Sequence, residues 1–291
     1  MAEILRTGAG EIRYLWKISL ALILTIVLII ISRIVMILAI QQVFVLQGVS
    51  SDIAFQNAQV FVSESSEGQA IASSIDLVLI LLLVFLLVTR IERREFHLTE
   101  LGLGLHHNSP LFAGLGLVIG CVLFLGAAMF GVLFGTLEFP LSPNLNQWPI
   151  VTTLVASIAF YVLNSFWQEI LFRGYLQTRA VEEYGRLIGV IAVAVVFVVF
   201  HGLVQSLTPI GILTGILLFS FIGLLYDKTK SLYLVGMIHA VLNFLPVLFN
   251  TWWQGLEAIL IYGIALALLF LMVHHIEQRA QTNSNKSQLQ K

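Results

Sequence analysis

Eight long apolar runs constrain this chain of 291 residues more than any other feature of its sequence. A helix that crosses a lipid bilayer needs about 20 mostly apolar residues. The runs lie near residues 16–40, 73–89, 110–135, 150–172, 187–205, 209–226, 231–249 and 257–275. The sequence therefore predicts an all-α fold, a polytopic membrane bundle of about eight transmembrane helices.

The composition excludes several other classes of protein. Hydrophobic residues make up 58% of the chain and charged residues only 11%, whereas soluble domains carry about 25% charged residues. Such a chain cannot cover a water-facing surface, so a soluble enzyme is excluded. The net charge of −1 offers no basic footprint, and no nucleic-acid partner is expected. The single Cys121 excludes a disulfide framework and a cysteine-based zinc cluster.

The distribution of Lys and Arg predicts which side of the membrane each loop faces. If the N-terminus is cytoplasmic, 14 of the 15 basic residues fall in cytoplasmic segments. The outer segments 47–72, 136–149 and 250–256 hold none. The exception, Arg33, lies in the first span and is expected to snorkel towards the outer interface. The predicted topology therefore has both chain ends inside, in a membrane that we expect to be a prokaryotic plasma membrane.

A few polar side chains lie inside these runs, where an ionisable group costs several kcal/mol and usually has a function. Only two of the seven histidines, His201 and His239, fall well inside apolar runs. Glu169 is the deep carboxylate, and Arg173 follows it by four residues, so we expect an ion pair within one helix. Asn243 follows His239 at the same spacing and therefore shares its helix face.

The helix that carries Glu169 has two polar stripes. Asn164 and Gln168 point roughly one way, and Ser165, Glu169 and Arg173 lie about 100° round the helix. We expect Asn164 and Ser165 to serve helix packing only. From the rise of about 1.5 Å per residue, the histidines, the carboxylate and the amides are expected to converge in the middle or cytoplasmic half of the bundle. The sequence therefore predicts one buried polar site.

These polar segments resemble the motifs of the CPBP family of intramembrane proteases, which includes the CAAX prenyl-protein endopeptidases and the bacterial Abi and bacteriocin-processing proteins. The segment QEILFRG at residues 168–174 resembles the family's EExxxRG. Phe197 and His201 match FxxxH, and His239 and Asn243 match HxxxN. Three motifs in this order, each on its own span, form a specific signal, and the resemblance covers roughly residues 150–250.

The resemblance implies an intramembrane endopeptidase that acts on membrane-associated proteins or peptides. In the family, the first Glu of EExxxRG and the His of FxxxH are thought to activate a water, and the His and Asn of HxxxN polarise the scissile carbonyl. The implied catalytic positions are Gln168, Glu169, Arg173, His201, His239 and Asn243. The role of a metal is disputed for the family. His201, His239 and Glu169 are conceivable zinc ligands, so sites with zinc and without any cofactor both stay open.

The sequence departs from the family at Gln168, which stands where the first Glu is expected. A neutral amide cannot act as a general base, although it can hold a water by hydrogen bonds. Glu169 is a poor substitute because it is turned about 100° away and is held by Arg173. The expected base is therefore His201, aided by Gln168.

Two other functions stay open at this point. Loss of the base would leave a catalytically impaired relative, acting as a membrane scaffold or an immunity protein. The third is a transporter that uses the buried His and Glu side chains as a proton relay, although the sequence lacks the repeats and broken helices of many transporters.

The chain is expected to divide into three parts. Residues 1–145 hold N-terminal transmembrane helices and a cytoplasmic connector, and residues 146–276 form the CPBP-like helical core. Residues 277–291 are a polar tail that is expected to be disordered and cytoplasmic.

Overall fold

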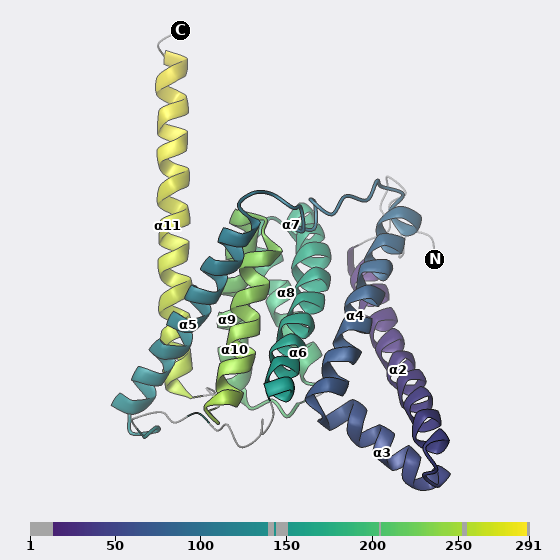
Figure 1. The fold of residues 1–291 in the computed structure, drawn as a ribbon. Coiled ribbons are helices and arrows are strands. Elements are labelled where there is room, and N and C mark those ends of the chain that lie inside the picture. The colour runs from purple at the N-terminus through teal and green to yellow at the C-terminus, as the bar shows by residue number, and fades with distance from the viewer. Residues whose placement is uncertain (1–13, 139–142, 144–150, 204, 252–254, 290–291) are drawn as a thin grey trace.

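The computed structural model describes residues 14–138, 143, 151–203, 205–251 and 255–289. These residues form helices and connecting turns, with no strand among them, which confirms the predicted all-α bundle (Figure 1). Two elements, η1 and η3, are π-helical. The elements are α2 (Tyr14–Leu46), α3 (Ser51–Glu64), α4 (Ser66–Leu86), η1 (Leu87–Ile91), α5 (Ser109–Leu133), α6 (Val151–Glu169), η3 (Ile170–Gln177), α7 (Thr178–Tyr184), α8 (Arg186–His201), α9 (Pro209–Thr229), α10 (Leu232–Leu248) and α11 (Leu256–Leu289).

Each predicted span corresponds to one helical stretch, and six described stretches are long and apolar enough to cross a membrane. The other two, α8 and α10, have 16 and 17 residues. At a rise of about 1.5 Å per residue they are shorter than the hydrocarbon core of about 30 Å. Helix α8 also ends earlier than predicted, at His201, whereas α10 ends at Leu248, close to its predicted end. His201 therefore lies at a helix end and not inside a span.

One helix was not predicted. The segment between the first two spans, predicted to lie outside, contains α3, whose buried residues Ala54, Ala58 and Val62 recur every four positions. This spacing gives the helix one apolar face, which packs against α2 and α4. The polar residues of this segment concealed the pattern.

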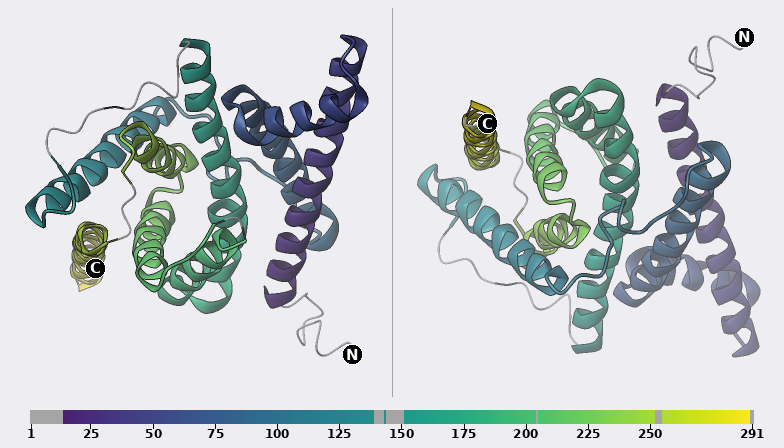
Figure 2. Two further views of the ribbon diagram at one scale, coloured as in Figure 1. Left: turned by 90° about the horizontal axis from the view of Figure 1, so that it is seen from below. Right: turned by 90° about the horizontal axis from the view of Figure 1, so that it is seen from above.

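The helices form three groups across the bundle. Figures 1 and 2 show α2 and α4 on one side, α5 and α11 on the other, and α6, α8, α9 and α10 between them. Helix α10 packs against both α5 and α6, whereas α9 packs against α8 and α11. The segments that carry the three motifs, α6 with η3, α8 and α10, thus lie in the middle group.

Small residues bring α5 close to α10. A Cβ atom at Gly116 would lie 2.3 Å from the carbonyl oxygen of Leu234, and one at Gly120 would lie 2.8 Å from Cβ of Val241. Close approach of membrane helices depends on such residues. The two glycines therefore fix the position of α10, which carries His239.

The helix ends that carry Lys and Arg lie on one side of the bundle. They include the end of η1, helix α7, the start of α8, the end of α9 and the later turns of α11, all on the upper side of Figure 1. This is the side predicted to be cytoplasmic. Helix α11 continues to Leu289, so the segment predicted to be a disordered tail is helical as far as it is described.

Arg33, the basic residue within the first span, pairs with a carboxylate of the second span. Its Nη2 lies 2.6 Å from Oδ2 of Asp76 on α4, and its Nη1 lies 3.2 Å from Oδ1. The side chain of Asp76 is 1% exposed, and Ser32 donates a further hydrogen bond of 3.3 Å to it. A charge buried away from water is tolerable when it is paired and hydrogen-bonded, and this pair joins α2 to α4.

Candidate active site

The first motif changes its helical geometry immediately after Glu169. Helix α6 ends at this residue, and the eight residues of η3 that follow are π-helical and buried. A π-helix pairs residue i with i+5, so side chains beyond Glu169 no longer follow the 100° spacing of an α-helix. The predicted Glu169–Arg173 ion pair is nevertheless present, with 3.4 Å between Arg173 Nε and Glu169 Oε2 and both side chains 0% exposed.

The second carboxylate oxygen of Glu169 contacts the third motif. Its Oε1 lies 2.9 Å from Nδ1 of His239. A carboxylate oxygen can only accept at this contact, so Nδ1 carries the hydrogen. His239 Nε2 is buried and has no hydrogen-bond partner among the described residues. Glu169 therefore joins Arg173 to His239, a contact that the α-helical stripes did not predict.

Arg173 is fully buried behind this pair. Its Nη2 donates a 3.2 Å hydrogen bond to the carbonyl oxygen of Phe219. The guanidinium carbon also lies 5.1 Å from the ring centre of Phe197 and 5.6 Å from that of Phe219, within the range of cation–π attraction. Arg173 thus positions Glu169 and two aromatic rings.

His201 is the last residue of α8. Its Nδ1 lies 3.0 Å from the carbonyl oxygen of Phe197, and because a carbonyl only accepts, Nδ1 carries the hydrogen here too. The ring of Phe197 lies next to both histidines, with centroid distances of 4.5 Å to His201 and 5.6 Å to His239. Phe197, the Phe of the second motif, thus forms a wall that the two histidines share.

Asn243 lies one turn beyond His239 and donates a 3.2 Å hydrogen bond from Nδ2 to Oγ of Ser165. Ser165 was expected to serve packing only, and it holds the amide of the third motif instead. Ser165 lies four residues before Glu169 on the same helix face, and this spacing could have placed Ser165 in the site. Asn164 accepts a hydrogen bond from the indole of Trp167 at 3.1 Å, away from Asn243.

A cavity of about 160 Å³ joins these residues, and His201, His239 and Asn243 all line it. Sequence reasoning missed the contributions of α9 and α11, which include Thr214, Phe219 and Tyr262. The Thr214 hydroxyl is buried without a hydrogen-bond partner among the described residues. In an apolar helix such a residue is indistinguishable from a packing residue.

Gln168 is buried, its Oε1 has no hydrogen-bond partner among the described residues, and it does not line the cavity. The predicted cooperation between Gln168 and His201 therefore has no contact to support it. Among the residues described, no three His, Cys, Asp or Glu side chains are arranged to hold a metal ion. One carboxylate oxygen of Glu169 contacts His239, and the other faces Arg173. We therefore assign no metal site to His201, His239 and Glu169.

The fold and the cavity define a polytopic helical membrane protein with a polar site built from three separate helical stretches. Residues 149–245 match the family model described as type II CAAX prenyl endopeptidase Rce1-like. The match covers 97 of the 291 residues and includes all three motifs, which confirms the resemblance to the CPBP and CAAX protease family in this segment. The family supports an endopeptidase of the intramembrane kind. No curated protein and no solved structure matches the chain.

Proposed function

We propose that this protein is an intramembrane endopeptidase that hydrolyses peptide bonds of membrane-associated proteins or peptides, in the plasma membrane of a prokaryote. The observation that carries the proposal is the shared cavity, because His201 of the second motif and His239 and Asn243 of the third line the same 160 Å³ space. Peptide hydrolysis needs a base for the water, a donor for the oxyanion and an acid for the leaving amine.

His239 is the proposed general base. Its Nδ1–H faces Glu169 at 2.9 Å, which fixes the tautomer and leaves Nε2 able to accept a proton from water. The hydroxide formed attacks the carbonyl carbon, and the imidazolium then returns the proton to the leaving amine. Glu169 stabilises the imidazolium between these two steps. This assignment replaces the expected base His201, whose Nδ1 faces only a neutral carbonyl.

Two neighbouring groups complete the proposed chemistry. Asn243 uses one amide hydrogen on Ser165 and keeps the second for the oxyanion. The Nε2 atom of His201 is the proposed acceptor that orients the attacking water. Gln168 needs no part in these steps, which accounts for its neutral amide.

One end of the cavity lies among helix ends and a loop, and this end is the proposed entry for the substrate. It is lined by Gln205, which is exposed, and Leu207 in the loop after α8, by Gly211 in the first turn of α9 and by Pro246 in the last turn of α10. All lie at helix ends opposite those that carry Lys and Arg. The inner end is formed by Phe219, behind which Arg173 is fully buried. We therefore propose that the substrate reaches the site from the non-cytoplasmic side.

The test is a comparison of membrane-protein N-termini between strains that express the natural chain, His239→Ala, His201→Ala or Gln168→Glu. The substitution Leu268→Ala, at an exposed position of α11, serves as the control. New N-termini that appear with the natural chain and the control, and vanish with both histidine variants, would support the proposal and identify substrates. Cleavage only with Gln168→Glu would favour the alternative, a catalytically impaired scaffold or immunity protein.

A further inference from the structure

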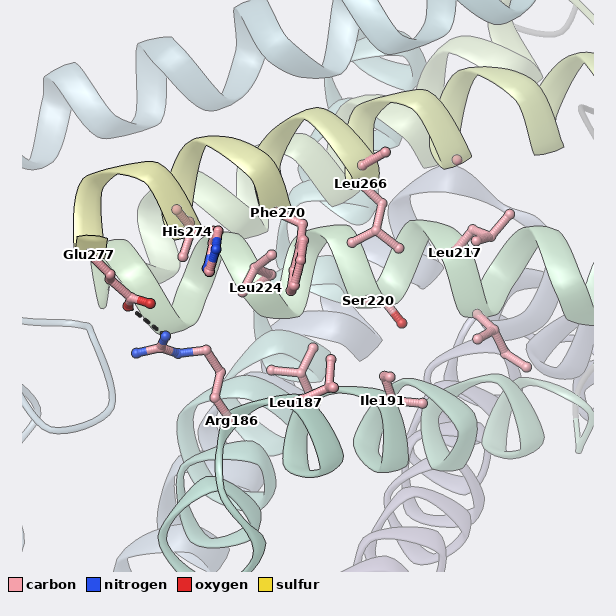
Figure 3. A pocket seen from close by; sticks show the side chains of 15 residues that line it. Arg186, Leu187, Ile191, Leu217, Ser220, Leu224, Leu266, Phe270, His274 and Glu277 are labelled. Atoms are coloured by element: carbon pink, nitrogen blue, oxygen red, sulfur yellow. Dashed lines mark hydrogen bonds and ion pairs between the residues drawn. The ribbon is translucent and has the colours of Figure 1, made fainter. Parts of the chain in front are cut away.

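A larger cavity of about 590 Å³ lies between α8, α9 and α11 (Figure 3). Leu217 and Ser220 of α9 line it, whereas the adjacent Leu218 and Phe219 line the candidate active site. The two cavities therefore occupy different faces of α9. The volume lies within the range of about 300–1,000 Å³ that is typical of small-molecule sites.

This cavity is a long apolar groove. Helix α9 packs against both α8 and α11 and forms the floor between them. From Gly263 to Glu277 the groove follows α11 for about 21 Å at 1.5 Å per residue, whereas one leaflet of the hydrocarbon core is about 15 Å deep. Its walls are open to the surroundings, with Leu187 61% and Phe270 49% exposed. The shape fits one extended aliphatic chain that lies along the membrane normal.

The cytoplasmic end of the groove is charged. Figure 3 shows Arg186 and Glu277 closing this end, with 2.6 Å between Nη1 and Oε1. Asp227 accepts from Nε of Arg186 at 2.6 Å and from Nζ of Lys230 at 3.0 Å, and Lys228 also pairs with Glu277. Three cations thus face two carboxylates, a net charge of +1. Arg186 and Lys230 remain 41% and 53% exposed.

We propose that the groove binds an anionic glycerophospholipid of the cytoplasmic leaflet, with one acyl chain on α9 and the phosphate beside Arg186. The ion pairs of Arg186 use Nε and Nη1, which leaves the Nη2 hydrogens for a phosphate oxygen. Anionic lipids are concentrated in this leaflet and are attracted by Lys and Arg at the interface. The inference rests on the groove alone and is independent of the proposed peptidase activity.

The test uses the purified full chain in phosphatidylcholine vesicles that contain a trace of phosphatidylglycerol with a photoreactive acyl chain. After illumination, mass spectrometry locates the adducts. We expect them on groove residues of α8, α9 and α11. We also expect about fivefold more adducts than with photoreactive phosphatidylcholine, the effect of about one basic residue near an anionic lipid. Adducts spread evenly over the lipid-facing helices would overturn the proposal.

Two substitutions separate the acyl chain from the headgroup. Ala267→Trp fills the groove, and Leu268→Trp is its matched control because Leu268 neighbours it on α11 but does not line the cavity. We expect Ala267→Trp to remove most groove adducts and Leu268→Trp to leave them unchanged. Arg186→Gln is expected to reduce the yield with phosphatidylglycerol to that with phosphatidylcholine. An unchanged yield in both Ala267→Trp and Arg186→Gln would contradict the assignment.

Discussion

Replacement of Glu169 by Gln tests the contact between the first and third motifs. The substitution keeps the shape of the side chain but removes its charge, and it leaves Arg173 buried without its carboxylate. Both side chains of the ion pair are 0% exposed, so solvent screening does not reduce the effect. Loss of one partner of such a pair costs about 3–5 kcal/mol. We expect Glu169→Gln to lower the free energy of unfolding by this amount.

The double variant Glu169→Gln with Arg173→Met separates stability from chemistry. Removal of both charges leaves no unpaired charge, so most of the lost stability is expected to return. The endopeptidase activity is expected to stay about 10²–10⁴-fold below that of the natural chain, the usual contribution of acid–base catalysis, because a neutral amide in place of the carboxylate cannot stabilise the His239 imidazolium. Unfolding in detergent followed by circular dichroism and cleavage of an identified substrate give the two readings.

Two results would refute this reasoning. A loss below about 1 kcal/mol in Glu169→Gln, the value typical of exposed ion pairs, would mean that the buried pair does not hold the site. Full activity in the double variant would mean that Glu169 only neutralises Arg173 and that His239 needs no carboxylate.

Two further predictions concern packing and access. Gly116→Ala should destabilise the protein by about 1–3 kcal/mol, the usual cost of overpacking, since its Cβ would lie 2.3 Å from a carbonyl oxygen of α10. Gly114→Ala is the control, because a Cβ there meets open space. Equal free energies of unfolding for the two variants would contradict the close approach of α5 and α10. In a Cys121→Ser background, a membrane-impermeant maleimide added to intact cells should label Gln205→Cys at the cavity mouth. It should label Glu183→Cys, exposed at the basic end, only after the membrane is opened, and the reverse pattern would place the mouth on the cytoplasmic side.

Hydropathy and charge predicted most of the fold. Each apolar run corresponds to a helical stretch of the described residues, and six of these stretches are long and apolar enough to cross a membrane, because lipid requires such runs wherever a helix crosses it. The runs did not reveal α3, whose apolar face is only three small or medium residues, Ala54, Ala58 and Val62. Nor could they predict the ion pair of Arg33 with Asp76. This pair joins two helices, so it depends on how the helices pack and not on the residue spacing within one helix.

The sequence predicted which residues form the site but not how they contact one another. The shared face of His239 and Asn243 follows from α-helical geometry and was predictable. The ion pair of Glu169 with Arg173 was predicted from the same spacing and is present, although Arg173 lies in the π-helical η3. The contact of Glu169 with His239 was not, because it joins two helices and lies where α6 gives way to the π-helical η3. The predicted role of Gln168 as a partner of the base gained no support, because Gln168 does not line the cavity.

Cleavage by the purified chain tests the endopeptidase proposal most directly. The natural protein, His239→Ala and Leu268→Ala would be reconstituted in vesicles with a substrate segment identified from the N-terminal comparison, and the product would be measured by mass spectrometry. We predict cleavage at the cellular site by the natural chain and by Leu268→Ala, and none above background by His239→Ala. Equal cleavage by His239→Ala, or no cleavage by a folded natural chain, would contradict the proposed active site.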